Sequence, residues 1–183
     1  MQKFDYGKVA SGGKTSMNIP ESDHPDNFGN VHAHPSESIG HKGGYSPHSM
    51  QDLLNFGKTS DRKSFIQFVV SGPKVYAMVY SKGHSRWDGT VAKYLNTRKD
   101  ASEEPTRDLL YKAAGGAEEY MKVMSSVESE KQAEEYLESL RKKVKNYGKH
   151  MEEVAFQECA AFAKQFKYAF IHWNLPKNDC LVM

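Results

Sequence analysis

The stretch Asn30-Val31-His32-Ala33-His34-Pro35 is the one around which the rest of the chain can be interpreted. Val31 and the aromatic Phe28 before it predict a short buried strand, and residues two apart on a strand point to the same face. His32 and His34 are therefore expected to project side by side, where two imidazoles can hold one cation. The proline that follows lacks the N–H that a neighbouring strand would need, so we expect the strand to end there.

A second motif, Ser49-Met50-Gln51-Asp52, stands where a loop rich in glycine and serine gives way to an apolar run. Ser and Asp three positions apart at such a boundary predict a capping box at a helix start. A carboxylate in the first turn of a helix can also face a metal on a neighbouring strand, so the two interpretations are compatible. A catalytic zinc takes three nitrogen or oxygen ligands and keeps a fourth position for water. Asp52 is the natural third ligand.

Together the two motifs resemble the JAMM motif of the JAB/MPN metalloprotease superfamily. The resemblance extends loosely to about residue 80 and leaves the C-terminal half of the chain unmatched. It implies that His32, His34 and Asp52 bind Zn2+ and that Ser49 helps to stabilise the oxyanion. The implied activity is a deubiquitinase-like hydrolysis of amide or isopeptide bonds, so the implied partner is a protein substrate, such as a ubiquitin-like conjugate.

The family also uses an upstream glutamate as general base, and its identity is open here. Glu21 is the sole glutamate before the histidine motif, and its neighbours predict a loop rather than a strand. Three alternatives remain: Glu21 reaches the site, Glu37 replaces it from the long loop between His34 and Asp52, or the base is missing. We rank Glu21 first.

Two other function classes compete with the metalloprotease hypothesis. A chain without the base would be a catalytically inert MPN-like protein-binding module, tethered to a membrane if its C-terminus is lipidated. A His-x-His pair with an aspartate also serves phosphoester hydrolases. Among the loop histidines, His48 is the one expected to approach the site, as a proton shuttle or a substrate contact.

The clearest strand signal is the pair 65–70 and 75–80, two β-branched and aromatic runs joined by Ser71-Gly72-Pro73-Lys74. They predict an antiparallel hairpin. The fold class we expect is α/β (α+β): a small sheet with a central antiparallel hairpin packed by helices. The resemblance adds a JAB/MPN-like (cytidine deaminase-like) core with a helical C-terminal half.

We expect a single JAB/MPN-like domain over residues 1–176. Its parts are an irregular N-terminal segment 1–27, a metal-motif core 28–95, a helical region 102–166 and a final strand 167–174. Apolar spacing predicts one long helix from a capping box at Ser129 to Phe166, bent or split at Gly148, with its charged residues in solvent. Cys159, within that pattern, is expected to be a small core residue rather than a nucleophile.

Composition limits the remaining possibilities. The chain has 183 residues and a formal net charge of +2, with no basic stripe interleaved with aromatics, so nucleic acid is not an expected partner. It shows no N-terminal signal region and no apolar run long enough to span a membrane. Two cysteines predict no disulfide framework. We therefore expect a reducing, cytoplasmic compartment.

The last four residues, Cys180-Leu181-Val182-Met183, resemble a C-a-a-X prenylation box within a flexible tail 177–183. The resemblance implies a farnesyl group on Cys180 and peripheral association with a membrane. The alternative is a plain disordered tail. The sequence leaves the oligomeric state open.

Overall fold

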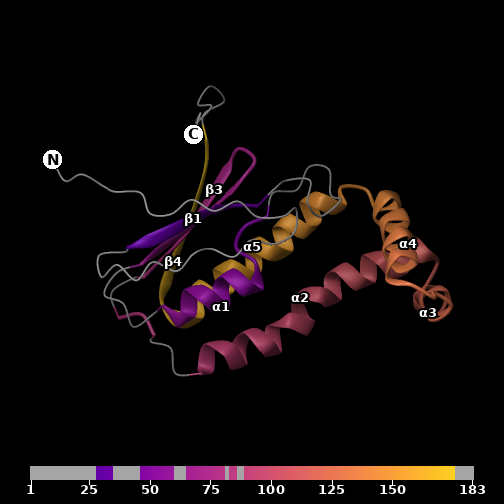
Figure 1. The fold of residues 1–183 in the computed structure, drawn as a ribbon, viewed down its shortest axis with the longest axis horizontal. Coiled ribbons are helices and arrows are strands. Elements are labelled where there is room, and N and C mark those ends of the chain that lie inside the picture. Colours follow the sequence, from indigo (N-terminus) through magenta and orange to yellow (C-terminus); the bar gives the residue numbers. More distant parts are fainter. Residues whose placement is uncertain (1–27, 35–45, 60–64, 81–82, 86–88, 176–183) are drawn as a thin grey trace.

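The computed structural model describes residues 28–34, 46–59, 65–80, 83–85 and 89–175, with the backbone alone for residues 99–105. Within these ranges a four-stranded sheet lies against helices (Figure 1). The elements follow in the order β1 (Gly29–Ala33), α1 (Met50–Lys58), β2 (Ile66–Ser71), β3 (Lys74–Tyr80), α2 (Thr90–Ala114), α3 (Ala117–Ser125), α4 (Glu130–Lys143), α5 (Tyr147–Phe166) and β4 (Tyr168–Asn174). The mixed α/β class is thus confirmed, whereas the JAB/MPN-like core stays a prediction.

The β2–β3 hairpin lies at the centre of the sheet, as its apolar residues predict. The strand order is β1-β2-β3-β4, with β1 parallel to β2 and the other neighbours antiparallel. Ser71 and Lys74 pair across a two-residue turn in which Gly72 has φ 56°, a conformation that L side chains rarely adopt. The predicted final strand is confirmed as β4, which pairs with β3.

The first three elements form a βαβ unit that positions the two motifs. Because β1 and β2 are parallel, the chain must cross between them, and it does so through α1. The carboxyl end of β1 is held against β2 by the amide of His34, which donates to the Val70 carbonyl over 2.8 Å. In open α/β sheets, ligands bind outside the carboxyl ends of such strands. The chain therefore brings the end of β1 and the start of α1 to a suitable place for a site.

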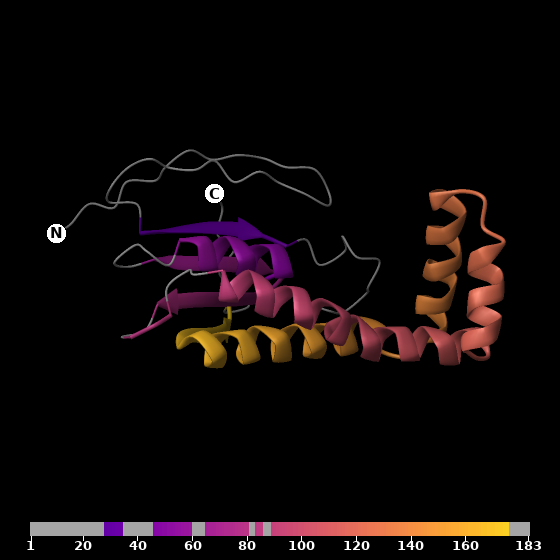
Figure 2. The same ribbon diagram turned by 90° about the horizontal axis from the view of Figure 1, so that it is seen from below.

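Helices α1, α2 and α5 pack on one face of the sheet (Figures 1 and 2). Residues of these helices and of the sheet form one buried apolar cluster: Leu53, Phe56, Phe65, Met78, Val91, Leu95, Cys159, Phe162, Ala163, Phe166 and Tyr168. The register places Gln67 opposite Met78 and Asn30 opposite Gln67, so Asn30 and Gln67 share the helix-covered face. By alternation along β1, His32 points to that face as well.

The opposite face of the sheet carries partly exposed apolar side chains. Val31 on β1 is 63% exposed, and Ile171 and Trp173 on β4 are 49% and 41% exposed. Trp173 contacts the ring of Phe68 edge to face. The polar side chains of β1 therefore lie on the helix side, away from this apolar surface.

The C-terminal helices extend beyond the sheet and build a second, smaller cluster. We call the part formed by α3, α4 and the ends of α2 and α5 packed on them the helical end (Figure 2). Its buried residues are Leu110, Leu140 and Tyr147. Helix α2 begins at Thr90, within the segment assigned from the sequence to the metal-motif core.

The predicted split of the helical pattern between residues 129 and 166 is present, but its predicted position at Gly148 is wrong. Helix α4 ends at Lys143 and α5 begins at Tyr147, so the break precedes Gly148. Val144 has extended backbone and Asn146 has φ 59°, a left-handed conformation that asparagine tolerates better than most residues. The apolar stripe is continuous in sequence, but Asn146 turns the chain between two helices. None of the helices in the described ranges combines the length and the apolar character needed to cross a membrane.

Candidate metal centre

The paired histidines lie side by side, as the strand alternation predicts. The Nε2 atoms of His32 and His34 are 3.2 Å apart. His32 is buried, with 8% of its surface exposed, whereas the side chain of His34 keeps 20%. The pair thus has a closed side toward the core and an open side toward solvent.

Asp52 meets both imidazoles from the first turn of α1. Its Oδ1 lies 3.1 Å from His32 Nε2, and its Oδ2 lies 3.2 Å from His34 Nε2. One ligand atom from each of the three residues can be chosen so that all lie within 4.8 Å of one another. The convergence expected from the two sequence motifs is therefore present.

The spacing of these atoms fits a tetrahedral metal site. Zinc bonds of about 2.0–2.1 Å at tetrahedral angles separate neighbouring ligand atoms by about 3.3 Å. The two Nε2 atoms are 3.2 Å apart, and each lies 3.1–3.2 Å from a different oxygen of Asp52, which is close to that value. Two imidazole nitrogens and one carboxylate oxygen are also a donor set used by catalytic zinc sites. The His32–His34–Asp52 cluster could therefore hold a metal ion, and its His34 side chain is partly exposed.

Ser49 holds Asp52 in place, which confirms the capping box. The Asp52 amide donates to Ser49 Oγ over 3.2 Å, and the Ser49 amide donates back to Asp52 Oδ2 over 2.7 Å. The Ser49 hydroxyl also donates to Oδ2 over 2.7 Å. The cap leaves Oδ1 facing His32, so one carboxylate serves both the helix start and the cluster. The oxyanion role of Ser49 stays a prediction.

The electrostatics of the cluster favour an ionised Asp52. Burial alone would raise the pKa of this carboxyl. Hydrogen bonds from His32 and His34, the charge of His32 and the hydrogen bond from Ser49 outweigh burial and lower the pKa of Asp52 below its usual range. Asp52 is thus a carboxylate, the form that binds metal ions.

His48 lies behind the cluster, in the core. Its Nε2 is 3.1 Å from the Gln67 carbonyl, its ring meets Phe170 edge to face, and only 3% of its surface is exposed. Burial lowers the pKa of His48 from 6.5 to about 4, against the opposing effects of the Gln67 hydrogen bond and the Asp52 charge. A buried neutral imidazole bound to a backbone carbonyl is a structural residue, so the structure does not support the predicted shuttle or substrate contact.

Cys159 packs beside His48 and is confirmed as a core residue. It is fully buried, and its Sγ lies 3.3 Å from the His48 carbonyl. Burial and the negative charge of Asp52 raise the pKa of the Cys159 thiol well above its usual range. The thiol is therefore kept protonated, which is the opposite of what a nucleophile needs.

Sequence reasoning did not single out two polar residues next to the cluster, Asn30 and Gln67. Four buried polar atoms in this layer have no hydrogen-bond partner among the described residues: Asn30 Oδ1, His32 Nδ1, His48 Nδ1 and Gln67 Oε1. The sequence does hold a signal for them. Asn30 is two positions before His32, and Gln67 interrupts an otherwise apolar strand. Both positions belong to the face that carries the histidines.

Several predicted site residues lie outside the described residues. These are both candidate bases, Glu21 and Glu37, the lipidation candidate Cys180, and the segments 1–27 and 177–183. The general base and the prenyl group therefore stay predictions.

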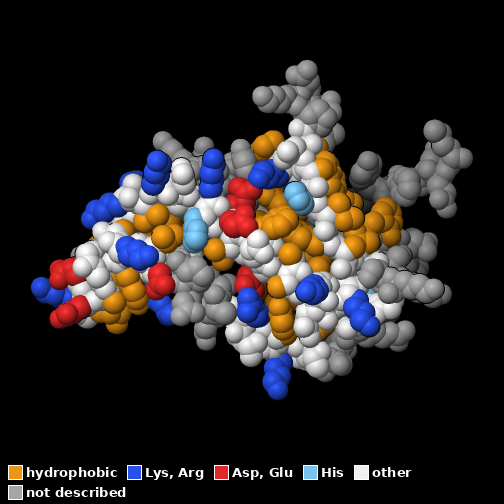
Figure 3. Space-filling model, turned by 180° about the vertical axis from the view of Figure 1, so that it is seen from behind, with side chains coloured by type: hydrophobic (Ala, Val, Ile, Leu, Met, Phe, Trp, Pro, Cys, Tyr) orange, Lys and Arg blue, Asp and Glu red, His pale blue; other side chains and the backbone are white. Residues whose placement is uncertain are grey.

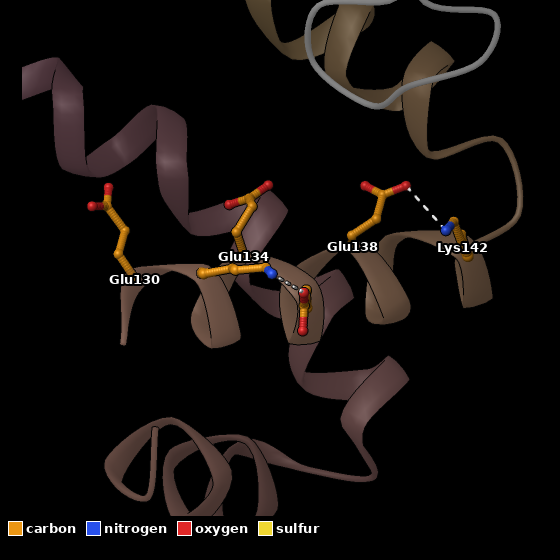
Figure 4. Close-up of a pocket in the computed structure, with 6 residues that line it drawn as sticks. Glu130, Glu134, Glu138 and Lys142 are labelled. Carbon is orange, nitrogen blue, oxygen red and sulfur yellow. Dashed lines mark ion pairs between the residues drawn. The ribbon is translucent and has the colours of Figure 1, made fainter. Parts of the chain in front are cut away.

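A shallow pocket elsewhere on the molecule is lined only by charged side chains of α4 (Figure 4). Its residues are Glu130, Lys131, Glu134, Glu135, Glu138 and Lys142. Most of these side chains are largely exposed, and their ion pairs, such as Lys142–Glu138 at 3.6 Å, lie along one helix face. This is the solvated charged face that the sequence predicts.

No family model, curated protein or solved structure matches the chain. The support for a function therefore comes from the arrangement of the chain's own residues.

Proposed function

We propose that this protein is a zinc-dependent metallo-hydrolase of the JAMM type that cleaves amide or isopeptide bonds in a protein substrate. The observation that carries the proposal is the convergence of His32, His34 and Asp52, in which the two Nε2 atoms lie 3.2 Å apart and each lies 3.1–3.2 Å from an Asp52 oxygen. The three come from the carboxyl end of a strand and the first turn of the following helix, as in the motif the sequence resembles.

The choice of zinc and of hydrolysis follows from the donor set and the partial exposure of His34. When bound at three such ligands, zinc supplies a water whose pKa is lowered to about 7 and a Lewis acid that polarises a carbonyl. The chain's own residues do the rest. Asp52 is oriented through its Oδ2 by Ser49, and the buried side of His32 keeps water off that side of the cluster. The more exposed side of His34 leaves room for a substrate carbonyl.

Proton transfer requires a base, and the candidates remain Glu21 and Glu37. Replacing each separately by Gln keeps the side-chain size and removes the basicity. The variant that lacks the true base should lose at least 100-fold in turnover, because general-base catalysis is worth about 10²–10⁴. The measurement is turnover of an isopeptide-linked substrate by zinc-loaded protein. Activity unaffected by either change would exclude both proposed bases.

The same preparation separates the rival functions. An inert protein-binding module would bind zinc or a partner without turnover of any substrate, and a phosphoesterase would cleave a phosphodiester but no isopeptide. Parallel assays with the two substrate classes distinguish these outcomes from the proposed activity.

A further inference from the structure

The four buried polar atoms without partners among the described residues belong to His32 of the metal cluster and to three residues on or beside the same face of the sheet. Asn30 and His32 are on the same face of β1, and Gln67 is the register partner of Asn30 on β2. His48 reaches the same strand through the Gln67 carbonyl. A buried polar group with no partner costs about 1–3 kcal/mol, so a layer with four of them calls for a structural or functional reason.

Their hydrogen-bonding characters are complementary when His32 binds a metal. Its Nε2 is the atom directed at His34 and Asp52, so the metal would take Nε2 and leave the proton on Nδ1 as a buried donor. Asn30 Oδ1 is a buried acceptor. Asn30 Oδ1 and His32 Nδ1 are not hydrogen-bonded to each other in this structure. Two residues along a strand are about 6.6 Å apart at Cα, so one bridging water can link an asparagine carbonyl to the neighbouring imidazole.

A metal-bound histidine almost always donates its second N–H to an acceptor, which fixes the tautomer and the orientation of the ring. We propose that Asn30 is the positioning residue of the metal site: its Oδ1 accepts the Nδ1–H of His32 through one bridging water, and so holds Nε2 toward the ion. This inference depends on the metal site of the proposed function, and it adds a residue that the sequence motif does not contain.

Asn30 is favoured over the other acceptors by its position. Gln67 lies opposite Asn30 in the register, whereas the residue opposite His32 is Val69. His48 is fixed through Nε2 to a backbone carbonyl on the β2 side. Asn30 shares both the strand and the face of His32, and so does His34, whose Nε2 belongs to the metal cluster itself.

The test compares three variants of the full chain by zinc dissociation constant, measured by competition with a chromogenic chelator. Asn30→Leu removes the acceptor at nearly constant size and should weaken zinc binding about 10–100-fold. Asn30→Asp keeps an oxygen acceptor and should bind zinc at least as tightly as the wild type. Gln67→Leu is the matched control from the same buried layer and should stay within about threefold of the wild type, since it leaves the His32 acceptor in place.

Urea unfolding of the metal-free proteins shows whether each variant is folded. If Asn30→Leu does not fold, the comparison of Asn30→Asp with the wild type decides, because loss of affinity in Asn30→Asp contradicts the inference. Wild-type affinity in folded Asn30→Leu, or an equal loss in Gln67→Leu, would also overturn it. A wild-type protein that binds no zinc would instead remove the proposed function itself.

Discussion

The β1–α1 junction and the helical end both gather titratable side chains, but they differ in what surrounds those side chains. At the junction, the Asp52 and His32 side chains keep 12% and 6% of their surface, and their ligand atoms meet at about 3 Å. On α4, Lys131 and Glu135 keep 86% and 67% and lie 3.9 Å apart. Figure 3 shows acidic and basic side chains interspersed in solvent over this end of the molecule.

Burial separates a candidate site from a solvated surface made of similar residues. Water screens the charges of α4, so each ion pair there contributes little to the stability of the fold. At the junction, desolvation would penalise the Asp52 charge unless partners stabilise it, and the histidines and Ser49 are those partners. This contrast predicts different responses to substitution at the β1–α1 junction and at the helical end.

Truncating one leucine in each of the two apolar clusters should have the same kind of effect on stability but different effects on metal binding. Leu53 on α1 is 1% exposed and Leu140 on α4 is fully buried, so replacing either by Ala should destabilise the protein by about 2–5 kcal/mol. Only Leu53→Ala should also weaken zinc binding, because Leu53 follows Asp52 in the helix. Urea unfolding and chelator competition measure the two effects. Equal loss of zinc affinity in both variants would contradict the distinction between the regions.

Acid should destabilise the protein through His48. Its pKa is lowered from 6.5 to about 4, so between these values the unfolded chain binds more protons than the folded one. Stability therefore falls as the pH drops from 6.5 to 4, by roughly 3 kcal/mol from this residue.

The acid effect is tested by comparing the wild type with His48→Gln, a variant that keeps a hydrogen-bond donor for the Gln67 carbonyl but does not titrate. Urea unfolding in the presence of a chelator should give a shallower pH dependence over this range for the variant. Identical slopes in the two proteins would contradict a buried neutral His48.

Two helix caps provide a smaller and matched comparison. Ser49 caps α1, and Ser129 caps α4 by accepting from the Gln132 amide. Replacing either by Ala should cost about 1 kcal/mol in unfolding free energy. Ser49→Ala should in addition weaken zinc binding, since Asp52 Oδ2 loses its hydroxyl partner. A zinc dissociation constant unchanged by Ser49→Ala would show that the cap does not position the ligand.

The smallest effect is expected at the exposed charges of α4. Glu135→Gln removes the ion pair with Lys131 and should change the unfolding free energy by less than about 0.5 kcal/mol. Zinc affinity should not change. A larger effect on either quantity would mean that the charged face is more than a solvated surface.

The parts of the structure that the sequence predicts are those with local causes. Alternation along a strand places His32 beside His34, a capping box starts α1 at Asp52, and β-branched runs define the hairpin. Each depends on residues a few positions apart. The convergence of Asp52 on the histidines was predicted from the three ligands that a catalytic zinc takes, and the motif resemblance implies the same three residues.

The parts that sequence reasoning missed depend on distant contacts or on a single residue's conformation. The strand order and the pairing of Asn30 with Gln67 join segments about 37 residues apart in the chain, which no local pattern encodes. The position of the break between α4 and α5, which the sequence placed at Gly148, follows from the left-handed conformation of Asn146 within an otherwise unbroken apolar stripe. The burial of His48 likewise depends on α5, which packs Cys159 against it.

The metal content of the purified protein tests directly whether His32, His34 and Asp52 bind a metal ion. After extensive dialysis against a buffer that contains trace zinc, elemental analysis should find one zinc per wild-type chain and none in His34→Ala. The variant should stay folded by circular dichroism, because His34 lies at the end of β1 with part of its side chain in solvent. A metal-free wild type, or stoichiometric zinc retained by His34→Ala, would contradict the account.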